Sequence, residues 1–246
     1  MPDVVVLLLA ASGTALATGL GAVPVFLLGS RSKRLTPALL GFAAGVMGVA
    51  AIAGLLLPAT EEGSAVEVLA GLAVGVAFLA LARRRLRPDA GFLGRDGPGA
   101  RTSALVFLVL FVHSLPEGFA VGTAFASDRA GLSLFVILAI AIQNVPEGTS
   151  VAIPMQEAGF GPARQFWAAV ATSAPQPLGA VVAYLAVEEV SGLLPVSFAF
   201  AAGAMLALIV VEMLPSAYSG SRPVESSCGL ALGAAVMLTL SYALGV

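Results

Sequence analysis

The chain has 246 residues, of which 59% are hydrophobic and only 11% are charged, whereas soluble globular domains carry roughly 25% charged residues. A mean hydropathy of +0.99 excludes a soluble domain, and a formal net charge of −2 gives no basis for a nucleic-acid partner. We therefore predict a protein embedded in the lipid bilayer.

The apolar residues fall into runs separated by short polar breaks. Each run is about as long as the 20 residues that a helix needs to cross ~30 Å of hydrocarbon. The runs are continuously apolar rather than alternating, which argues against the strands of a β-barrel. They lie near residues 4–29, 36–58, 65–83, 103–126, 131–155, 163–187, 194–217 and 227–245. The sequence thus predicts an all-α integral membrane protein with eight transmembrane helices, in a single domain that covers residues 1–246.

The charged residues between these runs indicate an orientation, because cytoplasmic loops carry an excess of Lys and Arg. The loops after the first, third, fifth and seventh segments contain Arg31, Lys33, Arg34, Arg83, Arg84, Arg85, Arg87, Arg95, Arg101, Arg164 and Arg222. The opposite loops contain Glu61, Glu62, Glu67, Asp128, Glu188 and Glu189, with Arg129 as their basic residue. We expect both termini to be extracytoplasmic, the loop 84–102 to be cytoplasmic, and the pair Glu61 and Glu62 to attract cations to the outer mouth.

Two of the predicted helices are related in sequence. The run Gly41–Met47 of the second segment resembles Ala199–Met205 of the seventh, and both continue to a Leu-Pro pair at residues 57–58 and 214–215. Small-residue runs also recur by chance, because Gly and Ala let membrane helices approach closely. Together with the similarity of the fourth and fifth segments, the repeat predicts a 3+2+3 arrangement of the helices.

Ionisable side chains within a membrane helix cost ~2.5–3.5 kcal/mol each, so each one indicates a partner or a function. The ionisable residues in the middle of the predicted helices are His113, Glu117 and Glu147, with Glu212 nearer the end of the seventh segment. Glu212 is either a station on the exit pathway or the partner of a Ser or Thr in a hydrogen bond between helices.

The fourth and fifth segments carry their polar residues at the same spacing. His113 precedes Glu117 by four residues, and Gln143 precedes Glu147 by four, so each pair shares one helical face. The glutamates stand in two Pro-Glu-Gly motifs, in which the proline leaves the carbonyl four residues earlier without its helical donor and the glycine leaves room for a helix or an ion.

These features predict a metal site between the two helices. Glu117 and Glu147 balance the charge of one dication, and the imidazole of His113 favours Zn²⁺ or Fe²⁺ over Mg²⁺ or Ca²⁺. A buried His–Glu pair that only joins two helices is the structural alternative. It accounts for one glutamate but not for the second copy of the motif.

The chain resembles the ZIP (Zrt/Irt-like) metal transporters, in particular their bacterial GufA-like branch. The resemblance rests on the HxxPEG stretch at 113–118, the QNxPEG stretch at 143–148, the AAGVM run at 43–47 and the basic loop after the third segment. It implies a multi-pass protein of the inner cell membrane, not an enzyme, which carries Zn²⁺, Fe²⁺, Mn²⁺ or Cd²⁺ into the cytoplasm by alternating access and needs no cofactor.

The resemblance also implies the residues that surround the transported metal and a division of the helices. The metal residues are His113, Glu117, Gln143, Glu147 and Met47. The first, fourth, fifth and sixth segments would carry the metal, and the others would form a scaffold that suits a homodimer.

Many relatives bind a second, adjacent metal with additional carboxylates. Ser114, Asn144 and Gln176 occupy those positions here, and none of them is charged. Because burying an uncompensated charge costs several kcal/mol, we predict one tightly bound dication rather than two.

Two other functions are compatible with buried His and Glu residues. An intramembrane metal-dependent enzyme also needs them, but the chain lacks an HExxH pair and has one histidine. An exchanger of H⁺ or a monovalent cation would use Glu117 and Glu147 and would tolerate loss of His113.

Overall fold

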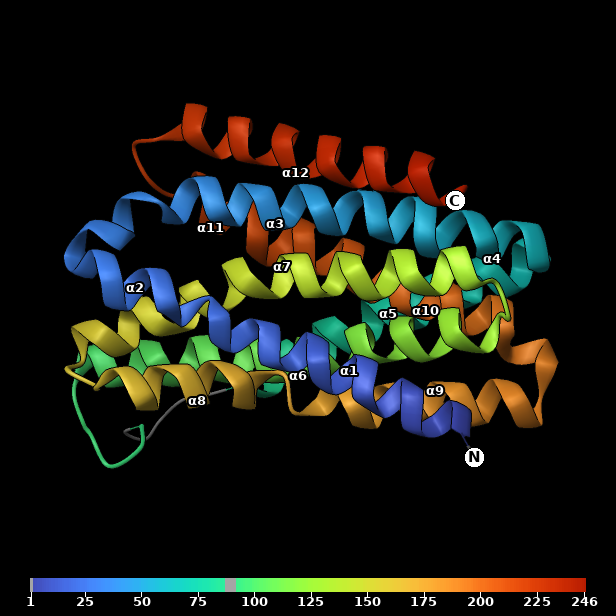
Figure 1. Ribbon diagram of the computed structural model, residues 1–246, viewed down its shortest axis with the longest axis horizontal. Helices are drawn as coiled ribbons and strands as arrows, with labels where there is room; N and C mark the ends of the chain where they lie inside the picture. The colour runs from blue at the N-terminus through green and yellow to red at the C-terminus, as the bar shows by residue number, and fades with distance from the viewer. Residues whose placement is uncertain (1, 87–91) are drawn as a thin grey trace.

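Eight helical spans run back and forth along the long axis of the molecule (Figure 1). The computed structural model describes residues 2–86 and 92–246, so Arg87 of the predicted basic loop lies outside the described residues. In these two ranges, the spans long and apolar enough to cross a membrane are Asp3–Leu28, Thr36–Glu62, Ala65–Arg85, Pro98–Ala126, Ala130–Glu157, Pro162–Glu189, Ser191–Tyr218 and Pro223–Leu244. The predicted all-α membrane fold with eight helices is confirmed.

The first and sixth spans are each broken into two helices. In the first, α1 (Pro2–Leu20) and α2 (Ala22–Leu28) meet at Gly21. In the sixth, α8 (Pro162–Thr172) is followed after two residues by α9 (Pro175–Glu189). Pro175 has no N–H to continue the hydrogen bonds of α8, and proline is favoured in the first turn of a new helix. The broken spans expose backbone polar groups in mid-membrane, which is tolerated only where protein or a polar cavity surrounds them.

The second and seventh spans share a different irregularity, a turn of π-helix in the same place. Their elements are α3 (Thr36–Ala51), η2 (Ile52–Leu56) and α4 (Leu57–Glu62) in one, and α10 (Leu194–Leu208), η4 (Ile209–Met213) and α11 (Leu214–Tyr218) in the other. Each π turn directly precedes a Leu-Pro pair, with Pro58 in α4 and Pro215 in α11. A proline ring clashes with the carbonyl four residues earlier, and a wider turn relieves that clash. The shared irregularity supports the repeat that the sequence predicts.

The remaining spans are single helices. They are α5 (Ala65–Arg85), α6 (Pro98–Ala126), α7 (Ala130–Glu157) and α12 (Pro223–Leu244), and two short 3₁₀ turns, η1 (Gly29–Arg34) and η3 (Ser191–Leu193), lie in connections. α6 and α7 continue as helices through Pro116 and Pro146. α5 begins with a capping box in which Ser64 and Glu67 satisfy each other's backbone N–H groups.

The helices pack in pairs that have the symmetry of a 3+2+3 repeat. The most extensive contacts join α3 with α12, α5 with α10, and α6 with α9, and α1 lies along α7. In the repeat, spans one to three correspond to spans six to eight, and span four corresponds to span five. The pair α3–α12 then corresponds to α10–α5, and the pair α6–α9 corresponds to α7–α1. The packing therefore supports the same internal symmetry as the π turns.

Glycines allow the paired helices to approach until their backbones touch. A Cβ atom at Gly45 of α3 would lie 2.2 Å from the carbonyl oxygen of Leu230, and one at Gly75 of α5 would lie 2.1 Å from that of Phe200. Such contact between small residues is the usual way in which membrane helices associate. It fixes the scaffold pairs α3–α12 and α5–α10.

Both chain termini lie at one end of the bundle, on the right in Figure 1. The opposite end holds η1, the turn at residues 92–97, the α7–α8 connection and the α11–α12 connection, and with them Lys33, Arg95, Arg164 and Arg222. We call this the basic end and the other the terminal end. The loops in which the sequence concentrates Lys and Arg therefore lie together at one end of the bundle.

Candidate metal site

The carboxylate of Glu117 lies in the centre of the bundle and is held by two amide groups. Gln143 on α7 donates from Nε2 to Oε1 of Glu117 at 2.7 Å, and Gln176 on α9 donates from Nε2 to Oε2 at 2.6 Å. All three side chains are almost completely buried. Hydrogen bonds to an ionised group are about twice as strong as neutral ones, so the pair of amides fixes the position of this carboxylate between three helices.

The amides are themselves connected to the first span. Thr14 of α1 donates to Oε1 of Gln176 at 3.1 Å, and Nδ2 of Asn144 donates to the same oxygen at 3.2 Å and to the backbone oxygen of Thr14 at 2.7 Å. We refer to Thr14, Gln143, Asn144 and Gln176 as the amide cluster. These bonds connect α1, α7 and α9 around the Glu117 carboxylate.

His113 and Glu147 face the other way, into a cavity. The cavity has a volume of about 290 Å³, and its polar wall is formed by His113 of α6, Glu147 and Ser150 of α7, and Glu212 and Ser216 of the seventh span. Seen from the two motifs, Ser150 and Ser216 lie further along their helices toward the basic end. The candidate site therefore has the amide cluster around Glu117 and a cavity beside His113 and Glu147.

Two side-chain atoms in this region that could bind a metal have no hydrogen-bond partner in the protein. Among the described residues, Nδ1 of His113 and Oε1 of Gln143 are buried without any hydrogen bond. Buried polar atoms in native proteins are nearly always satisfied, so each exception needs an explanation. An imidazole nitrogen and an amide oxygen beside two carboxylates are suitable donors for a borderline transition metal.

The structure does not bring the acidic and imidazole groups into a single cage. Within residues 2–86 and 92–246, no three His, Cys, Asp or Glu side chains are arranged to hold a metal. The physical reason is visible in the hydrogen bonds, since both oxygens of Glu117 are engaged by amides. A metal at this point would have to draw the Glu117 carboxylate toward His113 and Glu147.

The glycines of the two Pro-Glu-Gly motifs seat the neighbouring spans. A Cβ atom at Gly118 would lie 2.1 Å from the carbonyl oxygen of Gln176, and one at Gly148 would lie 1.7 Å from that of Thr18. The space that the sequence assigns to a helix or an ion is therefore filled by helices. It places the broken spans, α1 and α9, directly against the two glutamate motifs.

The two methionines at repeat-related positions differ in their surroundings. Met47 of α3 is completely buried in the main hydrophobic core. Met205 of α10 lines a narrow crevice together with His113, Pro116 and Glu117. Met205 is thus a second thioether to consider beside the predicted Met47.

The three neutral residues of the predicted second site do not act alike. Asn144 and Gln176 belong to the amide cluster, whereas the hydroxyl of Ser114 donates to the backbone oxygen of Leu110 at 3.0 Å. This is the usual bond of a serine to its own preceding helical turn. Ser114 is buried but is not joined to the cluster by a hydrogen bond.

Two of the three predicted pathway residues, Glu212 and Glu61, have ionic partners. Glu212 pairs with Arg83 at the end of α5, with 2.8 Å between Nε and Oε1, so neither a Ser nor a Thr is its partner. At the terminal end, Glu61 pairs with Arg129 at 3.2 Å, and Glu62 is exposed. Arg129 therefore compensates the charge of one of the two glutamates that are expected to attract cations at this end.

Thr14, Met205 and Arg83 lie at or beside the candidate site but do not stand out in the sequence as site residues. Thr14 is one of several hydroxyl residues in the first run, and only the fold shows that it faces Gln176. A closer use of the repeat would have found Met205, because it stands where Met47 does in the related run.

A membrane bundle with a buried histidine and two buried glutamates next to a cavity has the features of a transporter for a cation. Residues 96–241 match the sequence model of a family described as ZIP zinc transporters. The chain belongs to this family, whose members are transporters rather than enzymes, and the predicted resemblance is confirmed.

Several individual proteins are similar over most of this chain. The zinc transporter GufA of Myxococcus xanthus is 34% identical over 241 residues, which are 93% of this chain and 95% of GufA. The zinc transporter ZIPB of Bordetella bronchiseptica is 35% identical over 93% of this chain and 78% of its own length. A putative zinc transporter of Arabidopsis thaliana is 35% identical over 92% of this chain, which spans 37% of the plant protein.

Proposed function

We propose that this protein carries a divalent transition metal, with Zn²⁺ as its main substrate, across the membrane through a site between α6 and α7. One observation carries the proposal: His113, Glu117 and Glu147 are buried in the bundle, next to unpartnered donor atoms on His113 and Gln143. The names of the bacterial relatives, which are zinc transporters, support Zn²⁺. Fe²⁺, Mn²⁺ and Cd²⁺ are further substrates that the same donors suit.

The donor set fits an ion that must leave again. Two carboxylates match the charge of one dication, and an imidazole with an amide oxygen favours a borderline metal over Mg²⁺ or Ca²⁺. The chain's one cysteine, Cys228, is exposed on α12, so thiolate does not contribute. A site without thiolate avoids the very tight binding that would trap the substrate, since conduction needs an ion that can leave as well as enter.

We propose that the basic end faces the cytoplasm of an inner cell membrane, with both termini outside. The excess of Lys and Arg at this end supports that orientation. The cavity beside His113 and Glu147 then lies on the cytoplasmic side, and the amide cluster separates the metal site from the outside. Alternating access would require the bonds between Thr14, Asn144 and Gln176 to break when the outer side opens.

Glu212 and the two acids at the terminal end are the proposed stations on either side of the site. Glu212 lines the same cavity as His113 and Glu147. Its pairing with Arg83 means that a metal ion must compete with a guanidinium to bind there. We keep Glu61 and Glu62 as the outer entrance, with Arg129 as the competing cation for Glu61.

A homodimer is a further part of the proposal. The third and eighth spans are the least buried, with 22% of their apolar window inside the bundle in each case. They are related by the internal repeat and both present apolar faces. Lipid or a second copy of the chain would cover those faces equally well.

We propose that one dication, not two, binds at the centre. In the position where a second metal would need negative charge, Gln176 and Asn144 offer amides that already satisfy Glu117 and each other. The double variant Asn144→Asp and Gln176→Glu should therefore raise the bound Zn²⁺ from about one to about two per chain, because it supplies the missing charge. Equilibrium dialysis followed by metal analysis measures this ratio.

The control for this stoichiometry is the conservative exchange Ser114→Asn, which adds an amide without charge. It should leave the ratio at one. If the native chain already binds two equivalent Zn²⁺ ions, or if the double variant still binds one, the amide cluster does not set the stoichiometry.

The experiment that tests the function is metal uptake by purified protein in proteoliposomes. The native chain should accumulate Zn²⁺, which a fluorescent chelator inside the vesicles measures. His113→Ala should lower the initial rate of uptake at least about 10-fold, because loss of a group that orients or binds a metal typically costs 10–100-fold in affinity or activity. An H⁺ or Na⁺ exchanger that uses only the glutamates would instead keep its activity in His113→Ala. Sodium uptake with no Zn²⁺ uptake would contradict the proposal.

A further inference from the structure

A groove on the outside of the bundle, near the basic end, is separate from the metal site. It has a volume of about 550 Å³ and is lined by Phe92, Leu93, Phe107, Arg164, Trp167, Ala168 and Ala171. We call it the aromatic groove. Its size falls within the roughly 300–1,000 Å³ of pockets that hold one small ligand.

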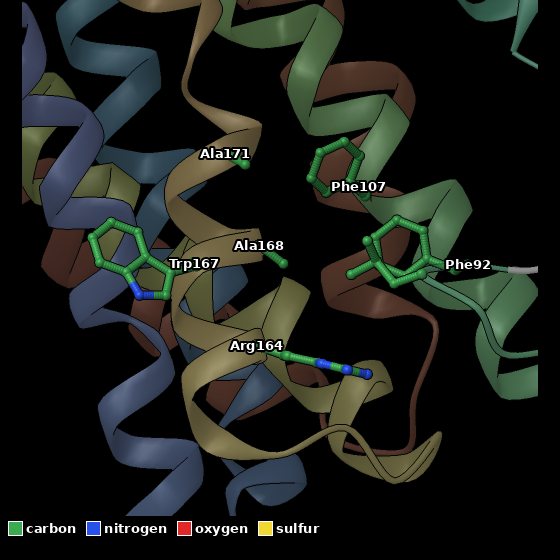
Figure 2. Close-up of a pocket in the computed structure, with 7 residues that line it drawn as sticks. Phe92, Phe107, Arg164, Trp167, Ala168 and Ala171 are labelled. Carbon is green, nitrogen blue, oxygen red and sulfur yellow. The ribbon is translucent and has the colours of Figure 1, made fainter.

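The walls of the aromatic groove come from three parts of the chain. Figure 2 shows Ala168 and Ala171 on one face of α8, with Phe107 of α6 across the gap and Phe92 next to Phe107 on the same side. The two alanines stand three residues apart, so they lie on the same side of the helix and leave room there. The result is an apolar channel between α6 and α8.

The turn at residues 92–95 is held firmly over the groove. Phe92 and Arg95 form a backbone pair, and the ring of Phe92 lies 5.3 Å from that of Phe107 and 6.1 Å from that of Phe160. Arg95 lies over the ring of Phe160 at 4.9 Å and donates to the backbone oxygen of Ala158 at 2.6 Å. This wall is therefore built by specific contacts.

One cation is directed into this apolar space. The side chain of Arg164 in the first turn of α8 extends across the groove beneath Phe92 (Figure 2). Among residues 2–86 and 92–246, no carboxylate forms an ion pair with it. An arginine at the mouth of an apolar channel is complementary to a molecule with an anionic head and an apolar tail.

The location of the groove identifies the kind of molecule. Arg164 lies in the first turn of α8, near the basic end, and Trp167 of the same helix is 62% exposed, with its ring on the other side of α8 from Phe92 and Phe107 (Figure 2). Tryptophan is enriched at the level of the lipid headgroups, and anionic lipids are attracted to basic residues at that level.

We propose that the aromatic groove binds an anionic phospholipid, with its phosphate on Arg164 and one acyl chain between Phe107 and Ala171. The lipid would then lie between α6, which carries His113 and Glu117, and α8, which leads to Gln176. This inference does not rest on the transported metal, and its test needs no transport.

Trp167 is the one tryptophan of the chain and, because it borders the groove and is exposed on α8, its fluorescence reports on lipid bound beside this helix. The protein is reconstituted into two preparations of phosphatidylcholine vesicles. In one, phosphatidylglycerol carries brominated acyl chains, and in the other, phosphatidylcholine carries them at the same mole fraction. Brominated phosphatidylglycerol should be preferred at the quenching site by about fivefold, the effect of one basic side chain on an anionic lipid. Equal quenching by the two lipids would overturn the proposal.

Three comparisons assign the preference to the groove. Arg164→Gln should abolish it, whereas Arg101→Gln, which removes a charge at the same end but outside the groove, should leave it intact. Ala171→Phe fills the channel and should abolish it with Arg164 present. An unchanged preference in Arg164→Gln or Ala171→Phe, or an equal loss in Arg101→Gln, would contradict the site.

A free phosphate ion is the other source of the same chemistry. Water-soluble glycerol phosphate added in excess should leave the quenching unchanged, because it has no acyl chain to bury. Its displacement of the brominated lipid would show that the groove recognises a soluble phosphate, and the lipid proposal would then be wrong.

Discussion

Replacing Glu147 by Gln should reduce the initial rate of Zn²⁺ uptake by at least about 100-fold, because uncompensated buried charge costs several kcal/mol and each 1.4 kcal/mol is a factor of ten. The exchange keeps the size of the side chain and removes its charge. Within the described residues, no side chain donates a hydrogen bond to the Glu147 carboxylate, which lines the cavity beside His113. The loss should therefore come from the metal and not from the fold.

Two variants complete this experiment. Glu117→Gln should reduce uptake to a similar extent, since the dication needs both carboxylates. Glu225→Gln removes an exposed carboxylate that pairs with Arg222, the residue before the first turn of α12, and it should leave uptake unchanged. Uptake by Glu147→Gln within about twofold of the native rate would mean that this carboxylate does not compensate the metal's charge.

The second large effect is expected at Gly148, where α7 touches the break in the first span. A Cβ atom here would lie 1.7 Å from the backbone oxygen of Thr18, so Gly148→Ala must push two helices apart. Overpacking of this kind costs typically 1–3 kcal/mol and occasionally more. Because the obstacle is backbone rather than a flexible side chain, we expect at least ~3 kcal/mol, which corresponds to a fall in Tm of roughly 6–12 °C.

Thermal unfolding in detergent measures this change, and Gly48 supplies the matched control. Gly48 is also a glycine within a transmembrane helix, but a Cβ atom there would meet nothing within 4 Å. Gly48→Ala should therefore keep or raise the Tm, since alanine is the better helix former. A native Tm in Gly148→Ala would show that α1 and α7 are not packed as closely as described.

The class of fold could be predicted from the sequence because lipid imposes a simple rule. Runs of about 20 apolar residues must become helices in hydrocarbon. The repeat was also readable, because the Leu-Pro pairs at 57–58 and 214–215 stand in similar places. The same rule says nothing of irregularities, so the π turns before these pairs and the breaks at Gly21 and before Pro175 were not predicted.

The polar centre was predictable in part for the same reason. His113, Glu117 and Glu147 stand out because ionisable residues are expensive in lipid, and all three are buried in the bundle. Neutral residues such as Thr14 carry no comparable signal, since a hydroxyl in a membrane helix usually bonds to its own backbone. Which neutral residues surround Glu117 depends on how the broken spans pack.

The two glutamates are unequal in a way that bears on transport. Glu117 is held by Gln143 and Gln176, whereas Glu147 faces the cavity with His113. A metal bound between them would replace the amide donors on Glu117 with its own charge. The release of Gln176 would also loosen its bonds with Thr14 and Asn144, which connects occupancy of the site to the bonds between α1, α7 and α9.

The central claim is that one dication binds between Glu117 and Glu147, with His113 as a ligand. Anomalous diffraction from crystals of the native chain soaked in Cd²⁺ tests it most directly, because Cd²⁺ scatters strongly and suits the same donors. We predict a single fully occupied peak within coordination distance of His113, Glu117 and Glu147. Two fully occupied adjacent peaks, or a peak that touches neither glutamate, would contradict it.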